Sequence, residues 1–127
     1  MKTNNLSSSS EDYLENILHL SRKKTDVRVT DLAIEMKISK PSVNKAIINL
    51  KNLGLIEHEK YGTITLTNEG ENIAKKVRDK HNILKKFLID VLEIEEEKAD
   101  KEACEIEHIL SSETIEKIKL FVDRYKK

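Results

Sequence analysis

The stretch TDLAIEMKISKPSVNKAIINLKNLG, residues 30–54, decides the fold of this chain. Its first part predicts a short helix over Asp31–Met36, which Thr30 can cap. After a short turn, Pro41 stands near the start of a second helix, where its missing N–H does no harm. An apolar stripe at i, i+3, i+4 and i+7 follows, and Gly54 suits the end of that helix. Two helices joined by such a turn form a helix-turn-helix.

The residues on either side of this motif extend it to a complete domain. Residues 55–59 and 63–67 alternate with period two around Lys60-Tyr61-Gly62, which predicts a β-hairpin. A hairpin directly behind a helix-turn-helix is a wing. Upstream, Ser8-Ser-Ser-Glu11 has the spacing of a capping box and predicts a first helix of about fifteen residues.

Helical periodicity continues after the hairpin. The spacing predicts a long helix over about 71–92, a second helix through Cys104 and His108, and a last helix capped by Ser111 or Ser112. We therefore expect a mainly α protein in which a winged helix-turn-helix domain, residues 8–70, is followed by a helical domain, residues 71–127.

Composition limits the functions that this chain can have. Its 127 residues contain 23 Lys+Arg and 23 Asp+Glu, so bulk charge cannot draw it to an acidic polymer. Positive charge is local instead, because residues 37–51 hold four lysines and no carboxylate. The single cysteine excludes an internal disulfide, and no apolar run approaches the ~20 residues that cross a bilayer. We expect a soluble cytoplasmic protein without membrane contact.

The second helix of the motif carries polar residues on the face away from its apolar stripe. An ordinary solvated helix would look similar, but the helix-turn-helix and wing favour double-stranded DNA as the partner. Asn and Lys side chains can reach base edges and phosphates. The predicted DNA-binding residues are Lys40, Pro41, Ser42, Asn44 and Lys45, with Lys60 and Tyr61 at the wing.

A candidate metal site lies in the C-terminal half. Cys104, Glu107 and His108 stand at i, i+3 and i+4, and the apolar residues of that helix are expected on its other side. Asp12 and Glu15 repeat the i, i+3 spacing in the first helix. Simpler explanations remain. Acidic residues such as Asp12 and Glu15 are favourable in the first turn of a helix, and a lone cysteine such as Cys104 is more often a small buried hydrophobe. His81, at the edge of an apolar stripe, could equally be a partly buried, hydrogen-bonded histidine.

Several segments together resemble the diphtheria toxin repressor family of metal-dependent transcription regulators, over roughly residues 10–122. They are EDYLE at 11–15, SKPSV at 39–43, the Tyr61-Gly62 wing tip followed by LTNEG at 66–70, Lys80-His81, and EACEIEH at 102–108. The resemblance implies a DNA-binding winged helix followed by a helical dimerisation and metal-binding domain. In length the chain is similar to the two-domain manganese transport regulators.

The resemblance also implies a ligand set and a mechanism. The metal ligands would be Asp12, Glu15, His81, Cys104, Glu107 and His108. The chain would be a homodimeric repressor of metal-homeostasis genes, with Mn(II) or Fe(II) as corepressor and up to two ions per subunit. Manganese regulators usually have Glu where Cys104 stands. Iron regulators have Cys at that position but Met where Asp12 stands, so this sequence mixes the two patterns. Lys85 and Asp100 replace a Glu and a His that hold an ancillary ion in the iron branch.

Two other functions are compatible with parts of the sequence. A winged-helix regulator could respond to a non-metal ligand, with the acidic segment merely solvated. Glu105-x-x-His108 could belong to a di-metal carboxylate enzyme, but that architecture needs a second such motif, which the sequence lacks. No catalytic motif is present either, so we expect no enzymatic activity.

Overall fold

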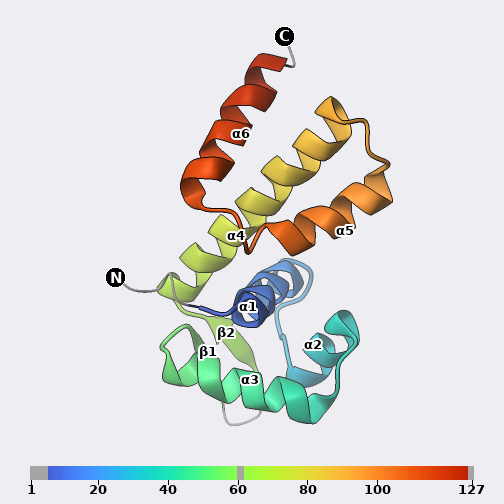
Figure 1. The fold of residues 1–127 in the computed structure, drawn as a ribbon. Helices are drawn as coiled ribbons and strands as arrows, with labels where there is room; N and C mark the ends of the chain where they lie inside the picture. The colour runs from blue at the N-terminus through green and yellow to red at the C-terminus, as the bar shows by residue number, and fades with distance from the viewer. Residues whose placement is uncertain (1–5, 60–61, 126–127) are drawn as a thin grey trace. The chain divides into compact units, whose positions relative to one another are not determined.

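The computed structural model describes residues 6–59 and 62–125. By its contacts the chain divides into two compact units, Met1–Lys75 and Lys76–Lys127. The first unit contains three helices, a two-stranded sheet and the start of a fourth helix, and the second is entirely helical (Figure 1). The predicted fold class, a mainly α protein with a winged helix-turn-helix and a helical second part, is confirmed.

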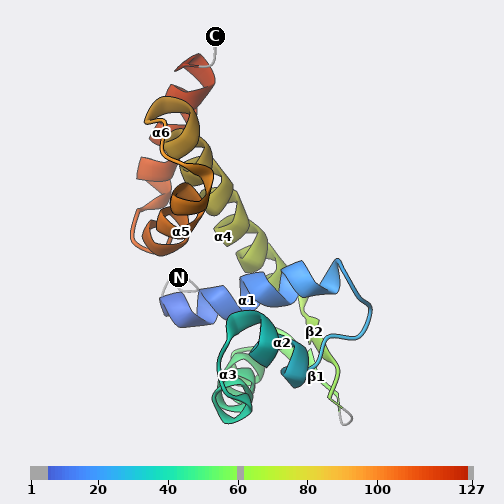
Figure 2. The ribbon, with the colours of Figure 1, turned by 90° about the vertical axis from the view of Figure 1, so that its right-hand side faces the viewer.

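The first unit is built on helices α1 (Ser8–Ser21), α2 (Val29–Met36) and α3 (Lys40–Asn52). Their buried faces form one core with the sheet. Strands β1 (Ile56–His58) and β2 (Ile64–Leu66) pair antiparallel, with Ile56 opposite Leu66. Val27 lies beside strand β2, because its carbonyl accepts a hydrogen bond from the Ile64 N–H at 2.8 Å. Figure 2 shows α2 and α3 packed beneath α1, with the hairpin alongside.

The helix starts differ from the sequence prediction in two places. Helix α1 is capped by Ser7, whose hydroxyl accepts from the Ser10 N–H, rather than by Ser8. Helix α2 begins at Val29, so Thr30 lies inside the helix and is not its cap. Asp31 instead accepts a hydrogen bond from the Arg28 N–H at 2.8 Å. Helix α3 starts as expected, with Pro41 in its first turn, and the Ser39 hydroxyl caps it by accepting from the Ser42 N–H.

Helix α4 (Asn68–Lys86) begins in the first unit and continues into the second. It runs on as the π-helical turn η2 (Phe87–Val91) and is followed by α5 (Glu96–Ile106) and α6 (Ser112–Tyr125). Both α5 and α6 contact η2. Leu84, Leu88, Ala99, Ala103 and Ile115 form the buried core of this unit. Within the described residues, no helix is long and apolar enough to span a bilayer.

Candidate metal centre and DNA-binding helix

Glu107 is a buried carboxylate in the second unit, only 1% exposed. It follows Ala103 by four residues and Ala99 by eight, so it continues the buried face of α5. The expectation that the polar trio lies apart from the apolar stripe is therefore wrong for Glu107. A buried carboxylate is costly unless partners compensate its charge.

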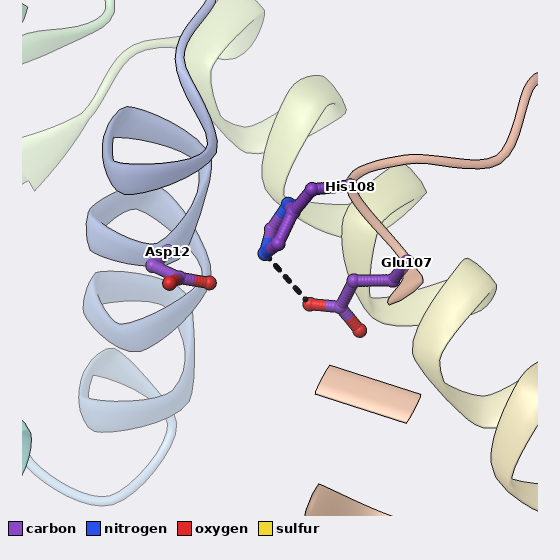
Figure 3. A group of neighbouring side chains, drawn as sticks. All are labelled: Asp12, Glu107 and His108. Atoms are coloured by element: carbon purple, nitrogen blue, oxygen red, sulfur yellow. Dashed lines mark ion pairs between the residues drawn. The ribbon is translucent and has the colours of Figure 1, made fainter. Parts of the chain in front are cut away.

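Two imidazoles lie beside this carboxylate. His81 Nδ1, from α4, lies 2.8 Å from Glu107 Oε1. His108 Nε2 lies 3.3 Å from Glu107 Oε2, as drawn in Figure 3. The latter contact lacks hydrogen-bond geometry. Among the described residues no group donates a hydrogen bond to the buried Oε2. One carboxylate oxygen thus retains an unused lone pair beside an imidazole.

Asp100 contacts the opposite edge of the His81 ring. Its Oδ1 lies 2.8 Å from His81 Nε2. The hydrogen bond with Glu107, aided by Asp100, raises the pKa of His81 to about 9, against the opposing effect of burial. The same contact with His81 lowers the pKa of Asp100. The metal-free centre therefore holds an imidazolium between two carboxylates at neutral pH.

Sequence reasoning did not assign Asp100 any role in this centre. The available signal was the family resemblance, in which Lys85 and Asp100 take the positions of two ancillary ligands. In the structure, His81 and Lys85 both lie beside Asp100 of α5. Lys85 Nζ is 3.4 Å from Asp100 Oδ1 and 3.7 Å from Glu96 Oε2. Only the packing of α4 against α5 reveals this contact.

Cys104 differs from Glu107 in its surroundings, because it is exposed. The helix that should carry Cys104, Glu107 and His108 together ends at Ile106, two residues earlier than expected. Glu107 keeps helical backbone angles as the C-cap residue, and its N–H still bonds to the Ala103 carbonyl at 3.0 Å. Cys104 and Glu107 thus keep their helical spacing. The thiol is nevertheless exposed, whereas the carboxylate is buried.

The remaining predicted ligands, Asp12 and Glu15, belong to the first unit. Both lie on α1 and are half-buried, while Tyr13, Leu14 and Ile17 of the same helix face the core. The label in Figure 3 marks Asp12 on this helix.

The predicted DNA-binding residues of α3 form one solvent-facing surface. Val43, Ile47 and Leu50 bury the opposite side of the helix. The exposed residues are Lys40, Pro41, Ser42, Asn44 and Lys45. Lys60 and Tyr61, the two wing residues of the prediction, lie outside the described residues. The surface carries positive charge without a carboxylate, which suits contact with phosphates.

The residues of the second unit fit a divalent cation. The buried Glu107 offers an oxygen that accepts no hydrogen bond from the described residues, and an imidazole lies on either side of it. Carboxylate and imidazole suit Mn(II) and Fe(II), and a thiolate from Cys104 would favour a softer ion.

Two family models together match nearly the whole chain. Residues 5–64 match the N-terminal DNA-binding domain of the iron-dependent repressors, and residues 67–127 match their metal-binding and dimerisation domain. The chain belongs to the iron-dependent repressor family. The predicted resemblance to metal-dependent transcription regulators is therefore confirmed.

Individual relatives agree with this family. An HTH-type transcriptional regulator of Methanocaldococcus jannaschii is 39% identical, with 95% of this chain and 98% of that protein covered. The transcriptional regulator MntR of Escherichia coli O157:H7 is 36% identical, with 91% and 74% covered. At the level of the family, the predictions of a DNA-binding repressor, of Mn(II) or Fe(II) as cofactor, and of DNA and a second copy of the chain as partners are confirmed.

Solved structures show the same fold. A manganese-dependent transcriptional repressor in complex with manganese superimposes with a TM-score of 0.84 at 26% identity, covering 90% of this chain and 52% of that chain. The IdeR protein of T. acidophilum gives a TM-score of 0.79 at 28% identity, covering 92% and 54%. The chain thus spans about half the length of these solved proteins.

Proposed function

We propose that this protein is a cytoplasmic metal-dependent repressor, without enzymatic activity, in which Mn(II) or Fe(II) is the corepressor that controls metal-homeostasis genes. The observation that carries the proposal is the buried Glu107 carboxylate, whose Oε2 accepts no hydrogen bond from the described residues and lies 3.3 Å from His108 Nε2. A buried carboxylate oxygen that accepts no hydrogen bond is costly in an apolar core, and a bound cation would balance its charge.

The proposed ligand set joins the two halves of the chain. His81, Cys104, Glu107 and His108 would supply nitrogen, sulfur and oxygen ligands from residues 71–127. Asp12 and Glu15 would supply carboxylates from the DNA-binding domain, residues 8–70. When bound, the metal supplies a positive charge that carboxylates of both domains can share.

Ligands from both domains would restrict how the recognition helix α3 is held. A two-fold dimer must place two such helices in major grooves about 34 Å apart. Several large apolar side chains of the second unit are exposed and would suit contact with a second copy: Leu92, Ile109, Leu120, Phe121 and Tyr125. Holding each α3 in one orientation would then favour the DNA-competent dimer.

Metal removal tests this function. A duplex can be selected from a random-sequence DNA pool with the protein and MnCl2, and its affinity then measured by fluorescence anisotropy. We expect EDTA to weaken binding at least tenfold, and excess MnCl2 to restore it, because the proposed ligands then have no cation to share. The Glu107→Gln variant should bind the duplex weakly with or without Mn(II).

A matched control keeps the result specific to the centre. Glu105→Gln, an exposed change two residues before Glu107, should behave as the unaltered protein. Operator affinity that does not change with EDTA would overturn the proposal and favour a winged-helix regulator that responds to a non-metal ligand.

A further inference from the structure

The two ring nitrogens of His81 face carboxylates of very different character. Nδ1 faces Glu107, whose side chain is fully buried, at 2.8 Å. Nε2 faces Asp100, whose side chain is 55% exposed, also at 2.8 Å. The His81 side chain itself is only 15% exposed, so packing limits its freedom to turn. The ring is thus held between one interior and one surface carboxylate.

Asp100 is in turn held by a cation. Lys85 Nζ lies 3.4 Å from Asp100 Oδ1, the same oxygen that contacts His81 Nε2. Lys85 is one helical turn after His81 on α4, so both groups reach Asp100 from the same face of that helix. The side chain of Lys85 is 28% exposed, which leaves its ammonium partly shielded from water. Lys85, Asp100 and His81 therefore form a continuous chain of polar contacts.

Only one edge of the His81 ring can serve a cation beside Glu107. A metal-bound imidazole keeps one N–H, and the partner of that N–H determines which nitrogen binds the metal. Asp100 accepts from Nε2, which leaves Nδ1 directed at the buried carboxylate. The positive charge of Lys85 beside Asp100 makes the Nε2 edge unfavourable for a second cation.

We propose that Asp100, anchored by Lys85, is the positioning residue that keeps the proton of His81 on Nε2 and so presents Nδ1 to the cation held by Glu107. This inference rests on the proposed metal-dependent function. It adds to that function which nitrogen of His81 binds, and two residues outside the predicted ligand set that control it. Loss of such a supporting residue typically weakens metal affinity by roughly 10- to 100-fold.

Nuclear magnetic resonance of the full chain loaded with ¹¹³Cd(II) tests the assignment directly. Long-range ¹H–¹⁵N spectra should show the ¹¹³Cd coupling on Nδ1 of His81 and the proton on Nε2. In Asp100→Ala the proton and the metal should no longer be confined to separate nitrogens. Asp100→Asn retains an acceptor oxygen and should rescue the pattern in part. A coupling on Nε2 in the unaltered protein would overturn the proposal.

Metal affinity gives a second readout. Mn(II) titrations followed by electron paramagnetic resonance should show binding weakened at least tenfold in Asp100→Ala and, to a smaller degree, in Lys85→Met. Glu96→Gln is the matched control, because it removes the other, 78% exposed partner of Lys85 and should leave affinity unchanged. Unchanged affinity in Asp100→Ala, with the fold retained by circular dichroism, would contradict the proposal.

The outcomes separate this inference from the proposed function. If the unaltered protein binds neither Cd(II) nor Mn(II), both are wrong. If it binds them and Glu107→Gln abolishes binding, while Asp100→Ala changes neither the coupling nor the affinity, only the positioning role is wrong.

Discussion

In the second unit, Glu107 and His81 contribute both to the packing of the core and to its charge balance. Glu107 occupies a core position that Ala or Leu would fill in an ordinary helix, and His81 carries the positive charge that makes this possible. A bound cation could take over that role, since Nδ1 must lose its proton to bind a metal. A proton and a metal ion therefore compete for the same atom, His81 Nδ1.

This competition predicts an unusual pH dependence for the metal-free protein. The pKa of His81 is about 9 in the fold against an ordinary 6.5, so the folded state holds the proton more tightly than the unfolded chain does. The resulting stabilisation is fully present below pH 6.5 and is lost as the pH rises through about 9. Over this window the unfolding free energy should fall by at most about 1.4 kcal/mol per pH unit.

Urea denaturation of the chelator-treated protein at several pH values from 6 to about 9.5 measures this effect. His81→Gln should be less stable at low pH and should show a flatter profile. His58→Gln, in the first unit, is the control and should keep the slope. Parallel profiles for the unaltered protein and His81→Gln would show that His81 does not cause the dependence.

At the scale of elements, the structure shows which parts of the sequence prediction depended on local patterns. The helix-turn-helix, the wing and the place of Pro41 in the first turn of α3 follow from periodicity and residue type within a few positions, and all are present. The start of α2 at Val29 was missed, because Thr30 is as good a cap by residue type as Arg28 is poor.

The centre depends instead on how elements pack. The contact of Asp100 with His81 requires the register of α5 against α4, which no local pattern encodes. Ala99, Ala103 and Glu107 are spaced by four residues and are all buried. The burial of Glu107 would have been predicted if the face with the two alanines had been taken as the core face. The family resemblance named ligands but gave no partner for the far edge of the His81 ring.

The junction between the wing and α4 depends on one glycine. A Cβ on Gly70 would lie 2.0 Å from the Leu55 carbonyl oxygen, a backbone atom that cannot turn aside. Gly70→Ala should therefore force the start of α4 away from Leu55 and destabilise the protein by at least about 2 kcal/mol. Urea denaturation measures this change. Asn72→Ala, an exposed change in the same helix, should be neutral or slightly stabilising, and equal stabilities for the two variants would contradict the argument.

The exposed lysines of α3 predict the salt dependence of DNA binding. Each phosphate contact that is lost lowers the slope of log affinity against log salt by about 1. The double variant Lys40→Ala/Lys45→Ala should thus bind the selected duplex more weakly, with a slope reduced by about 2. Lys101→Ala, at an exposed position of α5, is the control. An unchanged slope in the double variant would remove α3 from the DNA-binding surface.

At the scale of the whole molecule, the proposed function requires that metal binding and DNA binding favour the same arrangement of the chain. Such coupling is reciprocal, so each ligand must strengthen the binding of the other by the same factor. The proposed ligand set, with members in both domains, would explain this coupling without any contact between metal and DNA.

The most direct measurement is therefore the affinity for Mn(II) with and without the selected duplex. Saturating duplex should tighten Mn(II) binding by the factor by which Mn(II) tightens duplex binding, and Glu107→Gln should abolish both effects. An Mn(II) affinity that is the same with and without the duplex would contradict this prediction.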